Sequence, residues 1–142
     1  MEPLTKDELK DIEPIEAAEN ILRDYITREN ITLKHAAGDK AYYSPNRDMI
    51  RLPLMEQFRD VSEYYSTAFH EATHSTMKES RCNRMEDRKG ILVAFGSNEY
   101  SKEELIAKIG SANIVNILGI ETNFRLYSSK TFTSTFSLAL LR

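Results

Sequence analysis

The stretch YYSTAFHEATHSTM, residues 64–77, decides how the rest of the sequence is interpreted. It places His70 and His74, two of the chain's three histidines, four residues apart, and Glu71 directly follows the first of them. In a helix, side chains four residues apart lie one turn above the other on the same side. The two imidazoles are therefore predicted to point at one metal ion.

The apolar side chains of this predicted helix gather on its other side, at Tyr65, Ala68 and Ala72. We therefore do not expect the histidines on the side that faces the core. Two histidines on a solvated surface are the alternative interpretation, but the His-Glu-x-x-His spacing favours a metal site.

The residue types of the stretch also indicate a reaction. A catalytic zinc ion takes three protein ligands and keeps one position for water, whose pKa falls to about 7. Glu71 lies about 100° round the helix from His70, which is a poor position for a ligand of the same ion. It is a good position for the base that takes a proton from the activated water. The stretch thus predicts Zn²⁺ as cofactor, His70 and His74 as ligands, and Glu71 as general base.

The third ligand must come from another part of the chain. The candidates are His35, Cys82, Asp87, Glu103 and Glu104. Cys82 is a less favoured ligand because a lone cysteine is more often a packing residue, and His35 is less favoured because it lies on a predicted strand. A carboxylate on a second helix that crosses the first gives a rigid ligand set, which favours one of the two adjacent glutamates.

The remaining sequence predicts an α+β fold in one domain, residues 1–142. Apolar side chains recur at helical spacing after Pro14, Asp60 begins the histidine helix with a capping-box pattern, and Gly119 ends a third helix from about residue 98. Three short segments rich in β-branched and aromatic residues predict a small antiparallel sheet, a three-stranded meander, packed against the helices. They are residues 31–36, 41–45 and 49–53. Residues 78–96 are predicted to form a long loop, and the tail, 121–142, has no assigned structure.

Composition gives no support for several functional classes, although it leaves single-stranded DNA possible as a partner. The formal charge is −3 over 142 residues, without a basic cluster for duplex nucleic acid or an anionic membrane. The apolar stretches are far shorter than the ~20 residues that span a bilayer. Cys82 is the only cysteine and the N-terminus has no signal-peptide pattern, so we expect a cytoplasmic protein.

Several segments, taken in order, resemble the zincin-like metallopeptidase domain of ArdC-type antirestriction proteins of plasmids and other mobile elements. The resemblance covers about residues 14–120 and implies an α+β zincin-like fold that hydrolyses peptide bonds. Full-length relatives carry an N-terminal domain for single-stranded DNA, which we do not expect in the residues before Pro14, so DNA binding is not carried over. The resembling segments are PIEAAENIL, AYYSPNRDMIRLP, FRDVSEYYSTAFHEATH, SRCNR, FGSNEYSKEELIAKIG and LGI.

The resemblance also implies a ligand set of His70, His74 and Glu104. Peptidases of the glutamate-ligand type carry a small residue three positions after the ligand, and ELIAK places Ala107 there. Glu103 stays open as the alternative ligand. Lys108 departs from the pattern, because relatives usually carry an acid there that orients a ligand histidine, and this support must come from elsewhere.

A zincin needs a further group that stabilises the oxyanion formed during hydrolysis. Tyr43, Tyr100 and Arg84 are the candidates, and we assign the role to Tyr43. The strand around residues 41–44 could pair with an extended peptide substrate. The alternative function is a non-catalytic antirestriction binding module that retains a structural zinc.

Overall fold

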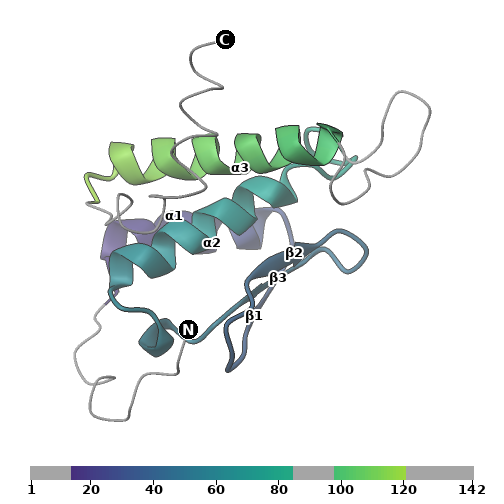
Figure 1. Ribbon diagram of the computed structural model, residues 1–142. Coiled ribbons are helices and arrows are strands. Elements are labelled where there is room, and N and C mark those ends of the chain that lie inside the picture. Colours follow the sequence, from purple (N-terminus) through teal and green to yellow (C-terminus); the bar gives the residue numbers. More distant parts are fainter. Residues whose placement is uncertain (1–13, 85–97, 121–142) are drawn as a thin grey trace.

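The predicted helical and strand segments form three α-helices and a three-stranded sheet over residues 14–84 and 98–120, which this computed structural model describes (Figure 1). Most of the expected long loop and the whole tail, residues 121–142, lie outside the described residues. The elements are α1 (Glu16–Arg28), β1 (Thr32–His35), β2 (Tyr42–Ser44), β3 (Met49–Leu52), a short 3-10 turn η1 (Met55–Gln57), α2 (Val61–Ser75) and α3 (Asn98–Ile117).

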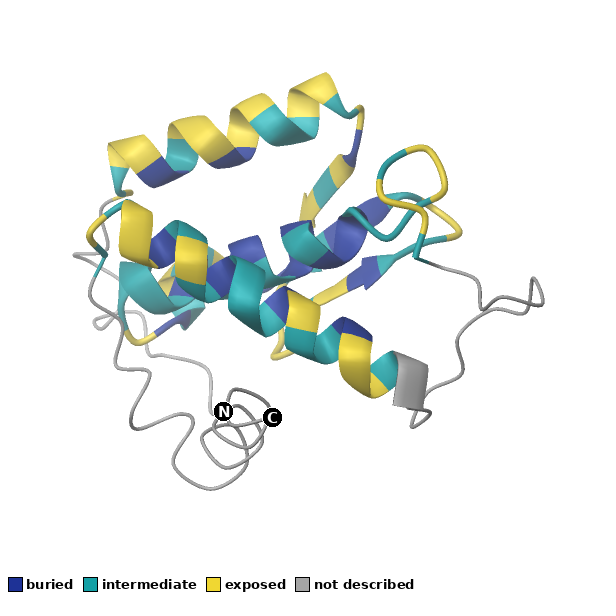
Figure 2. Cartoon of the chain, turned by 90° about the horizontal axis from the view of Figure 1, so that it is seen from above, coloured by how far each residue is buried: buried dark blue, intermediate teal, exposed yellow. Residues whose placement is uncertain are grey.

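Helix α2 is the centre of the molecule, between α1 and the sheet on one side and α3 on the other (Figure 1). It begins at the predicted cap, where the side chain of Asp60 accepts a hydrogen bond of 2.8 Å from the N–H of Glu63. Tyr65 and Phe69 are almost fully buried, and Ala68 is completely buried. Figure 2 shows the buried positions gathered where the elements face one another.

The sheet is mixed, and the prediction of an antiparallel meander is wrong. Its strand order is β1-β3-β2, with β3 antiparallel to β2 and parallel to β1. The reason lies in the composition of β3, whose Met49, Ile50 and Leu52 are all buried, whereas β1 is mostly exposed. The most apolar strand takes the central position, where it is paired on both edges and covered by α2.

Helix α3 packs closely against α2 because small residues face each other. Ala107 is fully buried, and the hydroxyl of Ser111 donates a 2.8 Å hydrogen bond to the backbone carbonyl of Ser66. A Cβ atom added to Gly110 would lie only 2.6 Å from Cγ2 of Thr73. This close approach lets the side chains of Glu103 and Glu104, near the start of α3, reach the histidines of α2.

Both ends of α3 agree with the sequence pattern. Gly119 ends the helix with a positive φ of 69°, as predicted. The helix already begins at Asn98, so Glu104 lies beyond its first turn and its side chain is not needed to cap the helix N-terminus. Within residues 14–84 and 98–120, no helix combines the length and the apolar character needed to cross a membrane.

Candidate metal centre

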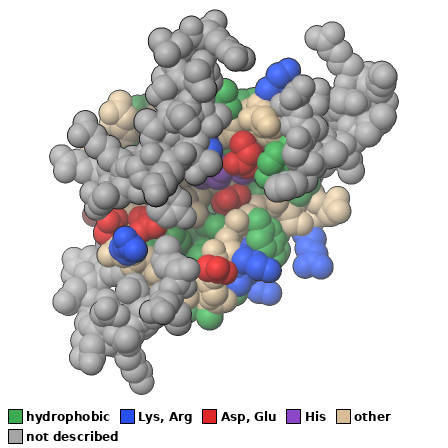
Figure 3. All heavy atoms as spheres, viewed as in Figure 1, with side chains coloured by type: hydrophobic (Ala, Val, Ile, Leu, Met, Phe, Trp, Pro, Cys, Tyr) green, Lys and Arg blue, Asp and Glu red, His purple; other side chains and the backbone are tan. Residues whose placement is uncertain are grey.

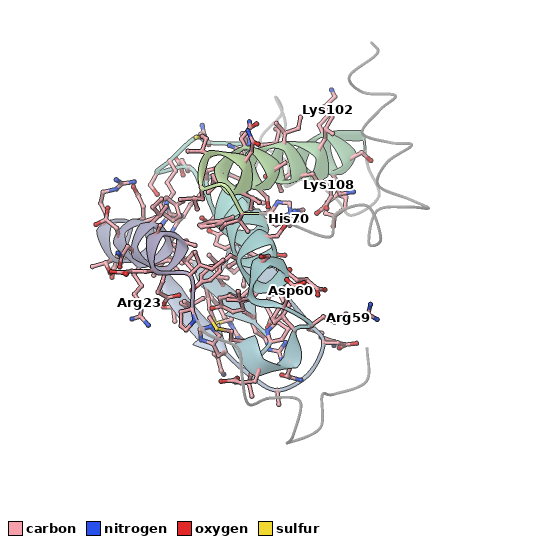
Figure 4. All side chains as sticks on the ribbon, turned by 90° about the vertical axis from the view of Figure 1, so that its left-hand side faces the viewer. Arg23, Arg59, Asp60, His70, Lys102 and Lys108 are labelled. Atoms are coloured by element: carbon pink, nitrogen blue, oxygen red, sulfur yellow. The ribbon has the colours of Figure 1, made fainter. Side chains whose placement is uncertain are left out.

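His70 and His74 of α2 and Glu104 of α3 converge on one point. Oε1 of Glu104 lies 2.9 Å from Nε2 of His74, and Oε2 lies 3.6 Å from Nε2 of His70. The imidazole centroids are 4.8 Å apart with their planes at 81°, and one donor atom from each of the three residues lies within 4.8 Å of the other two. Figure 4 shows His70 near the place where α2 passes α3.

This donor set fits a tetrahedral divalent ion. Zinc takes imidazole nitrogen and carboxylate oxygen at about 2.0–2.1 Å, which separates tetrahedral donors by about 3.3–3.4 Å. The separations of 2.9 Å at Oε1 and 3.6 Å at Oε2 of Glu104 lie on either side of this value, as expected of side chains that could share one ion. Three protein donors also match the ligand number of a catalytic rather than a closed structural zinc site.

The centre is largely shielded from solvent. The exposed fraction of the side chain is 10% for His74, 23% for His70 and 31% for Glu104. The histidines point away from the apolar side of α2, as the sequence predicts, but α3 covers them there. Figure 3 shows histidine and acidic side chains together near the middle of this face.

The charged groups of the centre shift one another's pKa values. Burial disfavours the charged form of His74, but hydrogen bonds to Glu103 and Glu104 outweigh it and raise the pKa of His74 to about 9. Hydrogen bonds with His70 and His74 hold the pKa of Glu104 well below its usual range. Glu104 is therefore ionised at neutral pH, as a metal ligand must be.

Glu71 lies beside the three donors and is itself buried, with 7% of its surface exposed. Burial raises the pKa of Glu71 above its ordinary value, while His70 and His74 oppose the rise. The backbone N–H of Tyr43 in β2 hydrogen-bonds to the Glu71 carboxylate and so connects it to the sheet. A desolvated carboxylate at this place is well suited to accept a proton.

Glu103 contacts the opposite ring nitrogen of His74. Its Oε1 lies 3.3 Å from Nδ1 of His74, and Arg84 donates hydrogen bonds to both carboxylate oxygens, at 2.9 and 3.0 Å. Burial disfavours the charged form of Glu103, but the hydrogen bonds with His74 and Arg84 hold its pKa below the ordinary value. The two adjacent glutamates therefore face different nitrogens of one imidazole.

Comparison with known families agrees with this geometry. A family model described as zincin-like metallopeptidase matches residues 16–135. The chain belongs to the zincin-like metallopeptidase family. The α+β zincin-like fold and the resemblance to ArdC-type proteins are thereby confirmed, with the sheet corrected to a mixed one.

Three relatives are similar to this zincin-like chain over most of its length. DNA primase TraC of Escherichia coli is 42% identical over 106 residues, which are 75% of this chain and 7% of that protein. The uncharacterized protein y4eC of Sinorhizobium fredii is 32% identical over 117 residues, 82% of this chain and 35% of that protein. The Mn(II)-bound crystal structure of antirestriction protein ArdC from plasmid R388 has a TM-score of 0.63 at 30% identity.

The ArdC alignment covers 86% of this chain and 43% of ArdC. The zincin-like chain therefore spans less than half the length of each of these relatives. A relative with bound Mn(II), together with the family and the donor set, supports a site for a divalent metal.

Two tyrosines lie near the zincin-like centre in different ways. The hydroxyl of Tyr43 donates a 2.7 Å hydrogen bond to Asp48, and no contact joins it to the histidines or Glu104. Burial raises the pKa of Tyr100, and the adjacent Glu104, to which its hydroxyl is hydrogen-bonded, raises it further. The structure thus brings Tyr100 rather than the hydroxyl of Tyr43 to the metal donors, and the oxyanion role assigned to Tyr43 stays a prediction.

The other candidate ligands are not gathered at the centre. Nε2 of His35 is hydrogen-bonded to the hydroxyl of Tyr64 at 2.7 Å, and Cys82 is exposed. Asp87 lies outside the described residues. The sequence interpretation missed Arg84 and Glu103 as a pair, because nothing local joins residues 19 positions apart, although the lack of an acid at Lys108 indicated that such a group was needed.

Proposed function

We propose that this chain is a metal-dependent hydrolase of peptide bonds, with Zn²⁺ held by His70, His74 and Glu104. The observation that carries the proposal is the convergence of these three donors beside the buried carboxylate of Glu71. A purely structural site has no need for a further buried carboxylate beside its three ligands.

A bound Zn²⁺ supplies Lewis-acid chemistry, in that it acidifies a water molecule and polarises a carbonyl. The residues of the chain do the remaining work. Glu71 accepts the proton from the attacking water, because burial raises its pKa toward neutrality, and afterwards donates it to the leaving amine. The oxyanion role passes in this proposal to the hydroxyl of Tyr100, which is supported by its hydrogen bond to Glu104.

The position of β2 supports a peptide as substrate. It is an edge strand, since the sheet order over the described residues is β1-β3-β2, and its backbone at Tyr43 touches Glu71. An extended peptide that pairs with such an edge would bring a backbone carbonyl close to the general base. We carry the antirestriction setting over from the solved relative as part of the proposal, and we propose the cytoplasmic location from the sequence alone.

The test is Glu71→Gln in the purified chain. Zinc content, measured by mass spectrometry of the metal, should remain at one per chain, because Glu71 is not a ligand. Cleavage of a mixed peptide library should fall by about 10²–10⁴-fold, the usual contribution of a general base. A wild-type chain that binds zinc but cleaves nothing would favour the second candidate.

The second candidate is a non-catalytic antirestriction module with a structural metal. It is favoured by the name of the solved relative, an antirestriction protein crystallised with Mn(II), which specifies no catalytic activity. A gel shift with single-stranded DNA, at a stated salt concentration, would show whether this chain alone binds nucleic acid. Metal analysis of the same preparation would show whether Zn²⁺ or Mn²⁺ is retained.

A further inference from the structure

We propose that Arg84 is a positioning residue for the metal centre. It fixes Glu103 against Nδ1 of His74, so that Nε2 of the same ring is left for the metal. This inference rests on the metal site of the proposed function and extends it to a residue outside every helix and strand.

The guanidinium of Arg84 grips Glu103 with two parallel hydrogen bonds. Nε donates to Oε2 at 2.9 Å, and Nη2 donates to Oε1 at 3.0 Å. Nη2 also donates to Oγ1 of Thr76 at 2.9 Å, at the end of α2. Arg84 therefore spans the end of α2 and the beginning of α3, the two elements that supply the metal donors, and a bidentate pair of this kind fixes orientation as well as distance.

The pairing of Arg84 with Glu103 determines which of the two adjacent glutamates is left to bind the metal. Both oxygens of Glu103 accept from Arg84, and Oε1 also lies 3.3 Å from Nδ1 of His74, so Glu103 is occupied by these two partners. Glu104 instead faces Nε2 of both histidines. A ligand histidine whose other N–H donates to a carboxylate has a fixed tautomer and a fixed ring orientation.

This arrangement replaces the support that Lys108 cannot give. A lysine ammonium only donates hydrogen bonds, so it cannot accept one from an imidazole N–H. Glu103 does accept one, from five residues earlier on α3. Because a buried, unpaired carboxylate would be costly, with 7% of Glu103 exposed, Arg84 is needed to keep it charged there.

Arg84 is itself held in place by the segment after α2, residues 76–84. Its backbone N–H donates to the carbonyl of Met77 at 2.7 Å, and that of Cys82 donates to the carbonyl of Thr76 at 2.8 Å. Three residues earlier, Arg81 binds Asp48 and Glu29 and donates to the backbone carbonyl of Ser75, rather than to the side chains of the metal centre. The segment thus carries two anchored arginines with different tasks, and Arg81 provides a matched control.

The experiment measures the affinity of the full chain for Zn²⁺ by competition with a chelator, for wild type, Arg84→Gln, Glu103→Ala and Arg81→Gln. Loss of a group that orients a metal ligand typically weakens binding about 10–100-fold, which we expect for Arg84→Gln and Glu103→Ala. The double variant Arg84→Gln with Glu103→Ala should bind Zn²⁺ no more weakly than Glu103→Ala alone, because the two residues act through one contact. Arg81→Gln should unfold at lower denaturant yet bind Zn²⁺ as wild type does.

Nitrogen-15 spectra of the imidazoles give a second measurement. In the zinc-loaded wild type the proton of His74 should reside on Nδ1, and in Arg84→Gln this signal should broaden or shift. Wild-type affinity and an unchanged His74 signal in a folded Arg84→Gln chain would overturn the proposal. If that variant does not fold, unchanged affinity in Glu103→Ala would do the same. A wild-type chain that binds no Zn²⁺ would overturn the metal site itself, which distinguishes the two failures.

Discussion

At the scale of single residues, the carboxylates of the site have different roles although all three belong to glutamates. Three glutamates lie close together, and each faces a different partner. Glu103 faces Arg84 and Nδ1 of His74, Glu104 faces Nε2 of both histidines, and Glu71 faces the backbone of β2. Their chemistry is set by these partners rather than by residue type.

Two tyrosine variants decide which phenol assists the reaction. Tyr100→Phe removes a hydroxyl that is hydrogen-bonded to Glu104, and we expect kcat for peptide cleavage to fall about 10²–10³-fold with zinc still bound. Tyr43→Phe removes the hydrogen bond to Asp48, and we expect a loss of about 1–2 kcal/mol in the free energy of unfolding. Steady-state kinetics and urea denaturation of both variants provide the test. A fall in kcat for Tyr43→Phe alone would return the oxyanion role to Tyr43.

The sequence specifies the residues of the site only as far as local geometry reaches. His70, His74 and Glu71 could be predicted because one helix sets their relative positions within two turns. The choice between Glu103 and Glu104 could not be derived from spacing, since both lie on α3 and the outcome depends on which ring nitrogen each one meets. Arg84 could be predicted only as an oxyanion candidate; its pairing with Glu103 could not, because that partner lies on another element.

At the scale of elements, the distance between α2 and α3 controls the site. Gly110 of α3 lies directly against Thr73 of α2, and a Cβ at Gly110 would lie 2.6 Å from Cγ2 and 2.8 Å from Oγ1 of Thr73. Anything that separates the helices there also moves Glu104 away from the histidines.

Gly110→Ala should therefore lower the free energy of unfolding by about 1–3 kcal/mol, the usual cost of overpacking, although alanine is the better helix former. Its affinity for Zn²⁺ should also fall. The double variant Thr73→Ala with Gly110→Ala removes the two clashing atoms and should recover most of both losses. Denaturation and chelator competition on the three variants measure this. Unchanged zinc affinity in a destabilised Gly110→Ala chain would show that the helix separation does not control the site.

The helices could be predicted from the sequence more fully than the sheet. Periodicity and caps are local, so α1, α2 and α3 begin and end close to the expected residues. Strand order is not local. β1 pairs with β3 although β2 lies between them in the sequence, because β3 has the apolar residues for the central position. A meander is only the simplest order for three strands, and here burial outweighs chain proximity.

Asp48 joins two elements through charge, and its effect should depend on pH. It lies between β2 and β3 and accepts hydrogen bonds from Arg81 and Lys78. These contacts, of which the one with Arg81 has the largest effect, hold the pKa of Asp48 well below the usual range. A depressed folded-state pKa contributes stability that is present above the unfolded value of about 3.9 and is lost as the pH falls below it.

Asp48→Asn should accordingly be less stable than wild type by about 2–4 kcal/mol at pH 7, because Arg81 is left buried without its main partner. The difference should narrow as the pH falls from about 4 toward 3. Urea denaturation at several pH values measures it, with Asp39→Asn, at an exposed position between β1 and β2, as control. A difference that stays constant down to pH 3 would show that the charge of Asp48 is not responsible.

At the scale of the whole molecule, the proposed ion connects two parts of the described chain that pack against each other through α2 and α3. Residues 14–84 contain both histidines, and residues 98–120 contain Glu104. A ligand that binds only when both parts are docked stabilises the folded state by mass action. The metal is therefore expected to contribute to folding as well as to the reaction.

Zn²⁺ at 100 times its dissociation constant should raise the free energy of unfolding by about 2.7 kcal/mol. For a chain of this size that corresponds to a rise of roughly 5–10 °C in Tm, which a chelator should reverse. Glu71→Gln should show the same rise, since it keeps all three ligands, whereas His74→Ala should show almost none. Scanning calorimetry of the three proteins, with and without Zn²⁺, measures this. An equal rise in His74→Ala would mean that the ion binds elsewhere, because no site that needs both α2 and α3 can survive the loss of the imidazole nearest Glu104.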